Sequence, residues 1–222
     1  VVGTTVLEFI GSSPSWIAGT GNLRLNTNIN CSTFTLGPSG ISNCNFQVGT
    51  LTYVSGATIT SGSTLDTGTA GSTLDLDGMA LDNCIARQGT QTLLSKLTAN
   101  TLIVCQTSSV AFAGAFGWEV GTFRNAGVNR NITLAAGNTY TVNTSMELIG
   151  TSAPAAGQIR LLSSVPSSYA FLNLTPGAAC SNRFCNPTDI DSSGGRLVTN
   201  VKGTLLRTIN WYVTNPDYFA FF

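Results

Sequence analysis

Few residues of this chain could do chemistry, and two pairs of carboxylates stand out among them. Asp75 and Asp77 flank a leucine before a glycine, and Asp189 and Asp191 flank an isoleucine before a Ser-Ser-Gly turn. Because side chains alternate across a strand, each pair would present both carboxylates on one face. These oxygens are candidate calcium ligands, although calcium needs several of them at one place. The alternative interpretation is the turn chemistry of aspartate beside glycine.

The chain has no histidine and only two lysines. Zinc sites that contain His, and Ser-His or Cys-His catalytic pairs, are therefore excluded. A polysaccharide lyase would need an acid–base pair supported by Lys or Arg in a groove, for which Asp75 and Asp77 are the candidates. We expect a protein that is not an enzyme and that uses no cofactor, and we keep the lyase as a less favoured alternative.

The six cysteines form an even set in a charge-poor chain. This pattern is typical of disulfides formed in an oxidising compartment, and buried free thiols are the alternative. Proximity in the sequence favours the pairs Cys31–Cys44, Cys84–Cys105 and Cys180–Cys185, with Cys44–Cys84 as a rival pair between coils.

Several features predict an exported protein. The chain starts at Val1 and carries no signal peptide, which we interpret as processing before export to the cell surface or the extracellular space. No apolar run approaches the roughly 18 residues of a membrane helix, so we expect no membrane span. Four sequons of the N-glycosylation type occur, although several would arise by chance in a chain this rich in Asn, Ser and Thr; they begin at Asn30, Asn131, Asn143 and Asn173.

The charge content limits the possible partners. Only 9% of the residues are charged, against roughly 25% in an ordinary soluble domain, and 10 basic residues balance 10 acidic ones. Nucleic acid is excluded as a partner because binding to phosphates needs clustered Lys and Arg. A neutral surface lacks the repulsion that keeps copies apart. It therefore suits a protein that associates with copies of itself, or one whose surface is solubilised by sugars. Cell-surface glycans are the alternative partner.

The elements that must position these residues are short strands. Between residues 131 and 174, apolar and polar residues alternate in four runs that Gly, Pro or Ser clusters separate, over 131–142, 146–151, 159–164 and 171–174. Alternation with period two is typical of half-buried strands, and regular spacing indicates an all-β sandwich, barrel or solenoid. The most apolar window, residues 97–128, should lie in the middle of the core.

Internal echoes favour a solenoid. Residues 41–50 and 81–90 share the pattern apolar-x-Asn-Cys-x-apolar-x-x-Gly-Thr at an offset of 40, and residues 33–36 resemble residues 139–142. A solenoid repeats its inward positions in every coil, and this offset fits two coils of about 20 residues. We predict a single-domain parallel β-solenoid over residues 1–222, with a β-sandwich as the alternative. Asn43 and Asn83 would form an asparagine ladder at one turn.

Residues 131–214 resemble a known class of proteins. The Leu-x-Ala-Gly-x-Thr-Tyr-Thr-Val run that begins at Leu134, the Ile-x-Leu-x-Ser-Ser run and the Leu-Asn-Leu run are similar to the coil repeat of secreted bacterial right-handed parallel β-helix proteins of the adhesin-like and cell-surface type. The Asp-x-Asp-Ser-Ser-Gly-Gly turn of residues 189–195 and Asn210-Trp211 match the way such units close. The resemblance implies a β-helix on a cell surface, with roles that span adhesins, surface layers and stalks. Those units usually sit in much longer chains.

The apolar ends of the chain lead to the functional hypothesis. Residues 1–20 would form a terminal cap or assembly arm, and residues 205–222 would form closing strands with an aromatic tail. We expect a structural subunit of an extracellular filament or surface layer whose copies associate head-to-tail. The alternative is a monomeric adhesin or carbohydrate-binding module that binds glycans through Trp16, Trp118 or Trp211. The predicted assembly residues are Val2, Val6, Leu7, Phe9, Ile10, Trp211, Tyr218, Phe219, Phe221 and Phe222.

Overall fold

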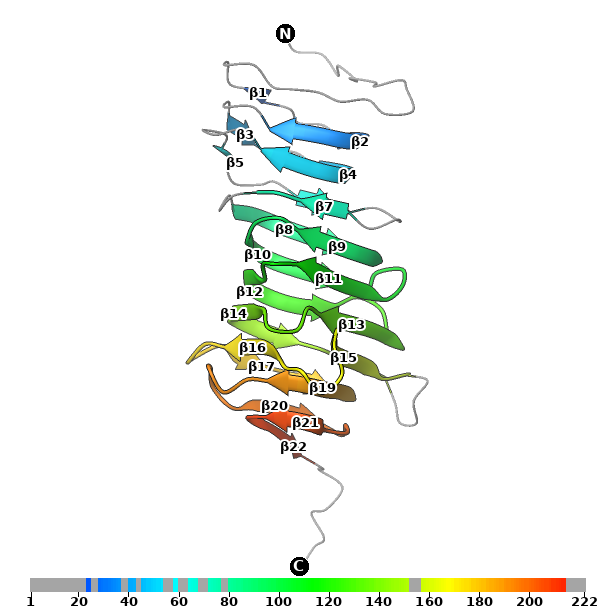
Figure 1. Ribbon diagram of the computed structural model, residues 1–222, viewed down its shortest axis with the longest axis vertical. Coiled ribbons are helices and arrows are strands. Elements are labelled where there is room, and N and C mark those ends of the chain that lie inside the picture. Colours follow the sequence, from blue (N-terminus) through cyan, green and yellow to red (C-terminus); the bar gives the residue numbers. More distant parts are fainter. Residues whose placement is uncertain are drawn as a thin grey trace, which may run out of the picture.

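The computed structural model of the chain is an elongated stack of strands in the part that it describes (Figure 1). It describes the backbone of residues 23–24, 28–36, 40–42, 45–53 and 58–59. It describes backbone and side chains of residues 64–67, 72–76, 80–151 and 157–214, apart from the side chain of Asp66. These segments contain strands and turns and no α-helix, so the predicted all-β class is confirmed.

Two stacks of parallel strands run along the molecule. Stack I contains β6 (Thr64–Asp66), β8 (Ala80–Ala86), β10 (Leu97–Val104), β12 (Trp118–Asn125), β14 (Thr139–Glu147), β16 (Ala170–Leu174) and β17 (Ala179–Cys180). Stack II contains β7 (Ser72–Leu74), β9 (Gly89–Leu93), β11 (Val110–Gly114), β13 (Arg130–Leu134), β15 (Ile159–Ser163), β19 (Cys185–Asp191) and β21 (Leu206–Ile209).

Eight further strands complete the coils at the two ends. Towards the C-terminus, a small three-stranded sheet contains β18 (Asn182–Arg183), β20 (Val198–Val201) and β22 (Trp211–Thr214). Towards the N-terminus lie β1 (Leu23–Arg24), β2 (Asn28–Leu36), β3 (Gly40–Ser42), β4 (Asn45–Tyr53) and β5 (Thr58–Ile59). Strand β4 pairs with both β6 and β7, and β19 pairs with both β15 and β16, so one strand near each end joins the two stacks.

The strand register shows a solenoid. Every strand pairing in the described residues is parallel, and each coil advances the chain by one layer. In stack I, one inward residue from each of five successive coils lies above the next, namely Leu65, Cys84, Leu102, Phe123 and Met146. A sandwich of hairpins would be antiparallel. The predicted parallel β-solenoid is therefore confirmed, and the alternative sandwich is wrong.

The alternating sequence produces this coil because one face of each strand points inward. The residues of β10 alternate in burial along most of the strand, and Leu97, Ala99, Leu102 and Val104 all point into the core. The inward residues of successive coils stack on one another and form a single continuous core.

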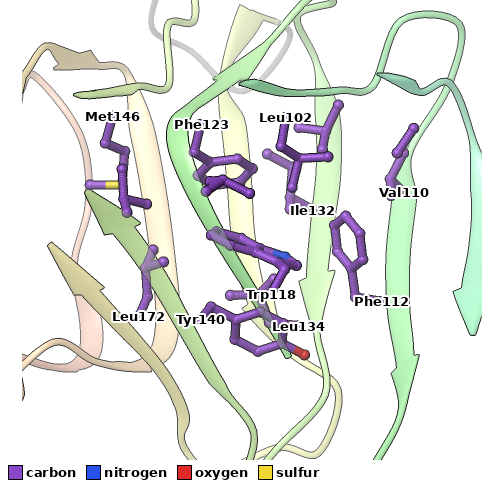
Figure 2. Packing of buried hydrophobic residues seen from close by; sticks show 14 of the residues in the cluster. Leu102, Val110, Phe112, Trp118, Phe123, Ile132, Leu134, Tyr140, Met146 and Leu172 are labelled. Carbon is purple, nitrogen blue, oxygen red and sulfur yellow. The ribbon is translucent and has the colours of Figure 1, made fainter. Parts of the chain in front are cut away.

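Trp118 occupies the middle of this core, as Figure 2 shows. Its ring centroid lies 4.7 Å from that of Phe123, 5.1 Å from that of Tyr140 and 6.2 Å from that of Phe112. Tilted and edge-on contacts of this kind stabilise a core beyond the area that they bury. The prediction that residues 97–128 hold the middle of the core agrees with this packing.

The structure corrects several details of the predicted coils. The predicted run at 146–151 is no separate strand, because Met146 and Glu147 complete β14. The sequence similarity between residues 41–50 and 81–90 does not match the strand register. Phe46 pairs with Leu65, and Leu65 pairs with Cys84, so Phe46 and not Cys44 lies in line with Cys84. Residues 33–36 pair with the part of β4 that continues into β7 of stack II, whereas residues 139–142 belong to stack I. The similarity between these two segments is therefore coincidental.

Candidate functional site

The C-terminal coil, residues 203–214, is the candidate functional site. It contains β21 and β22 and is the last coil that the structure describes (Figure 1). Strand β21 pairs with β19, and β22 pairs with β20. Among the described strands neither has a second partner, so each presents one edge of unpaired backbone groups. Such edges are templates for the addition of another strand.

The inward positions of the C-terminal coil are less covered than those of the coil before it. Ile190 and Asn200 are fully buried, whereas Thr208 and Val213, which follow them in register, are only half-buried. On the flank of the same coil, Leu206 is 50% exposed. Ile209 is also exposed, and Tyr212 is 57% exposed. The described residues therefore leave an apolar end on the solenoid.

An ion pair fixes one corner of this end. Asp189 and Arg207 occupy equivalent positions in successive coils, because the residues before them pair with each other and so do the residues after them. Arg207 donates from Nε to Asp189 Oδ1 at 2.5 Å and from Nη2 to Oδ2 at 2.7 Å, and the Asp189 side chain is 4% exposed. The backbone N–H of Ser167, one coil earlier, donates to Oδ2 at 3.1 Å. Arg207 holds the pKa of Asp189 below its usual value, and the carboxylate raises the pKa of Arg207.

A second corner is fixed by hydrogen bonds from its side chains to the turn at residues 192–195 of the preceding coil. Trp211 is only 8% exposed, and its Nε1 donates to Ser192 Oγ at 2.9 Å. Asn210 Nδ2 donates to the Ser192 carbonyl at 2.9 Å and to the Gly195 carbonyl at 3.2 Å. These bonds tie the C-terminal coil to the turn of the coil before it, so its edge is held in place.

The predicted exposed tryptophans are buried. Trp118 is fully buried, and Trp211 belongs to the core, so the proposals of glycan binding at these two residues and of assembly through Trp211 are wrong. The solenoid needs large apolar side chains at both inward positions. Trp16 lies outside the described residues, as do the other predicted assembly residues Val2, Val6, Leu7, Phe9, Ile10, Tyr218, Phe219, Phe221 and Phe222.

The predicted calcium ligands have other roles in the described residues. Both oxygens of Asp189 accept from Arg207, and Asp191 Oδ1 accepts from the backbone N–H of Ser193 at 2.7 Å in a turn. Asp75 is half-buried, and Asp77 lies outside the described residues. Within the part of the chain described, no three His, Cys, Asp or Glu side chains gather as metal ligands would. The turn interpretation therefore fits Asp191.

The four cysteines whose side chains are described carry reduced thiols, namely Cys84, Cys105, Cys180 and Cys185. Cys84 lies beside Leu102, so Cys105 is three residues further along, roughly 10 Å at about 3.3 Å per residue. A disulfide needs Cα atoms within about 7 Å, so the predicted Cys84–Cys105 pair is wrong. The rival Cys44–Cys84 pair is not present either, because the Cys84 thiol is reduced.

Cys180 lies in a polar corner. Its thiol donates to the Thr199 carbonyl at 3.2 Å and accepts from Asn182 Nδ2 at 3.3 Å, so the predicted bond to Cys185 is not formed. Burial raises the pKa of Cys185, and the neighbouring Cys180 raises it further. Cys44 lies outside the described residues, and so does the side chain of Cys31 in β2, so the Cys31–Cys44 pair remains a prediction.

The sequon asparagines differ in their surroundings. Asn143 is exposed, and its Nδ2 donates to Glu119 Oε1 at 3.0 Å. Asn131 and Asn173 are half-buried, and the side chain of Asn30 lies outside the described residues. Their glycosylation stays a prediction.

An asparagine ladder is present, at positions that the sequence did not indicate. Asn182 and Asn200 are buried and adjacent in register. Asn182 Oδ1 accepts from the backbone N–H of Leu148 at 3.0 Å, and Asn200 bonds both the N–H and the carbonyl of Cys185. At the predicted ladder, Asn83 instead donates to Thr64 at 3.4 Å, and Asn43 is not described. The signal available in the sequence was the spacing between these two asparagines, which equals one coil.

Comparisons of the chain with protein-family models, with curated proteins and with solved structures found no match. Within the described part of the chain, no helix is long and apolar enough to cross a membrane.

Proposed function

We propose that this protein is a structural subunit of an extracellular filament or surface layer, and that its copies stack head-to-tail. The C-terminal coil of one copy would receive the first coil of the next. The observation that carries this proposal is the C-terminal coil itself, where open strand edges coincide with half-buried inward residues and with exposed Leu206, Ile209 and Tyr212.

Stacking of this kind would use the same strand pairing and side-chain burial that hold successive coils together. A further parallel strand would satisfy the free backbone groups of β21 and β22 and would cover Thr208 and Val213. Because the two surfaces in contact differ, the contact is heterologous and builds an open filament unless it closes into a ring. Zero net charge removes long-range repulsion between subunits.

The receiving surface is also rigid before association. The Asp189–Arg207 ion pair and the Trp211–Ser192 hydrogen bond hold the C-terminal coil on the coil below it. A surface that is already ordered loses little conformational entropy when it binds, so more of the contact energy contributes to affinity.

The extracellular setting rests on the sequence. Residues 131–214 resemble secreted bacterial cell-surface β-helix proteins, and a charge-poor Ser, Thr and Asn surface is compatible with that setting. The proposed role is structural and does not involve catalysis.

Electron microscopy of the purified protein tests the proposal. We expect filaments from the unmodified chain and their loss in Leu206→Glu and Tyr212→Glu, which place a charge in the contact. The matched control is Val165→Glu, since Val165 is similarly exposed but lies in the turn between β15 and β16. Monodisperse particles, unchanged when residues 1–10 are deleted, would contradict the proposal.

A further inference from the structure

A hollow on the flank of the solenoid has the features of a small binding site. It encloses about 290 Å³ and lies beside the ends of β10, β12 and β14, far in sequence from the C-terminal coil. Phe116, which is 45% exposed, contributes an aromatic ring to its wall. The other lining residues are Lys96, Ala115, Gly117, Gly137, Asn138, Thr139 and Thr141.

A glycine in the wall of the hollow lets two coils approach each other closely. Gly117 and Thr139 lie two residues before the paired residues Glu119 and Thr141, so they are neighbours in successive coils. A Cβ at position 117 would lie 1.8 Å from the Thr139 carbonyl oxygen, so the backbones approach closely there and only glycine fits.

The wall of the hollow is held in place without a ligand. Asn138 Nδ2 donates to the carbonyls of Gly114 and Phe116, each at 3.0 Å, and so fixes the loop that carries the aromatic ring. Within the turn that carries Asn138, the N–H of Gly137 donates to the Tyr169 carbonyl at 2.8 Å. A site that is already ordered loses little entropy when a ligand binds.

One charged residue, Lys96, lines the hollow, and it is paired with Glu119, which lies outside the lining. Lys96 Nζ donates to Glu119 Oε2, and Asn143 Nδ2 donates to Oε1 at 3.0 Å. Lys96 holds the pKa of Glu119 below its usual value, so Glu119 is an ionised acceptor at neutral pH. The charge of Lys96, which lies in the same wall as Phe116, is therefore cancelled by its partner.

We propose that this hollow binds one uncharged pyranose ring of a glycan. A pyranose has an apolar C–H face, which would lie on Phe116, and a rim of hydroxyls that both donate and accept. The hydroxyls of Thr139 and Thr141 would accept from sugar hydroxyls, and Lys96 would donate to them. Because Glu119 already neutralises Lys96, the hollow offers no unpaired positive charge to the carboxylate of an acidic sugar. The volume lies at the lower end of the ~300–1,000 Å³ range of small-molecule sites, which suits one ring.

This inference does not depend on head-to-tail stacking, because its residues lie outside the C-terminal coil. An open hollow that holds a ligand of about a dozen non-hydrogen atoms should bind it in the millimolar range. The test is a titration of the ¹⁵N-labelled chain with methyl β-glucopyranoside, methyl β-galactopyranoside and methyl α-mannopyranoside, followed by amide shifts.

We expect at least one pyranoside to shift the amides of Phe116, Asn138 and Thr139, with affinity at least about tenfold weaker in Phe116→Ala and in Lys96→Met. Tyr212→Ala is the matched control, since Tyr212 is an exposed aromatic of β22 far from the hollow, and it should bind as the parent does. Unchanged spectra of the variants elsewhere would show that they fold. The inference is overturned if no pyranoside shifts these amides, if Phe116→Ala binds as the parent does, or if sodium glucuronate binds more tightly than every uncharged sugar.

Discussion

Asp189 and Arg207 occupy the same corner of two successive coils, and both have left-handed backbones, with φ of 56° and 47°. Neither is glycine, so each conformation costs energy that the surroundings must offset. Their two-bond ion pair joins the two corners directly. The ion pair that orders the C-terminal coil therefore joins two residues whose backbone conformations are energetically unfavourable.

The ion pair should make the stability of the protein depend on pH. Asp189 has a folded pKa below its unfolded value, so its contribution is complete above the unfolded value of about 4 and is lost as the pH falls through the folded pKa. Arg207→Gln should therefore lower the urea midpoint relative to the parent at pH 7. The difference between the two proteins should shrink below about pH 4, as the Asp189 carboxylate of the parent becomes protonated.

Arg160→Gln is the control for this prediction, because Arg160 is exposed in the middle of β15. It should change the midpoint little at any pH. A difference between Arg207→Gln and the parent that is constant from pH 7 to pH 3 would show that the ion pair is not the cause.

Trp118 should dominate the stability of the core. Trp118→Ala removes the ring that contacts Phe112, Phe123 and Tyr140 and should cost about 3–5 kcal/mol in urea unfolding. Trp118→Phe should cost less, about 1–2 kcal/mol, because the buried Nε1 of Trp118 has no hydrogen-bond partner to lose. Phe171→Ala, at an exposed position, should stay within about 0.5 kcal/mol of the parent. Equal losses in Trp118→Phe and Trp118→Ala would contradict this account.

The fold could be predicted from the sequence because its main signal is local. Period two in residues 131–174 indicates strands, and β13, β14, β15 and β16 lie there. The register could not be predicted in the same way, because coil length varies within stack I: the coil from Cys84 to Leu102 is shorter than the coil from Phe123 to Met146. The 40-residue offset of the sequence pattern therefore differs from the true two-coil step, which runs from Phe46 to Cys84.

The candidate site was harder to predict because its partners lie in different coils. Asp189 is a typical turn residue, but left-handed positions seldom hold arginine, and the sequence does not show that Asp189 and Arg207 are partners. The aromatic C-terminal segment predicts a surface role for Trp211, but its register position beside Val198 places it in the core. Only the three-dimensional stacking of coils decides such cases.

The buried asparagine ladder should be costly to break. Asn200→Ala would leave the N–H and the carbonyl of Cys185 without their side-chain partner and should cost about 2–3 kcal/mol in urea unfolding. Asn143→Ala, at an exposed asparagine of β14, should cost less than about 1 kcal/mol. A similar loss in both variants would show that burial of the ladder is unimportant.

The thiols should differ in reactivity when the protein is kept reduced. Burial raises the pKa of Cys105 to about 12 and also raises the pKa of Cys185, so neither forms much thiolate at pH 8. Cys180 is only half-buried and should react with iodoacetamide at least about tenfold faster than Cys84, Cys105 or Cys185, as measured by peptide mass mapping. In urea the four rates should converge. Fast labelling of Cys105 in the native protein would contradict its burial.

Photo-crosslinking from position 212 tests the central proposal most directly. Tyr212 is exposed on β22, and benzoylphenylalanine in its place would capture whatever covers the C-terminal coil. A mixture of ¹⁴N and ¹⁵N copies distinguishes links between chains from links within one chain. We predict links between chains, from position 212 of one copy to residues 1–59 of another. Links confined to residues 215–222 of the same chain, or links between two C-terminal coils, would contradict head-to-tail stacking.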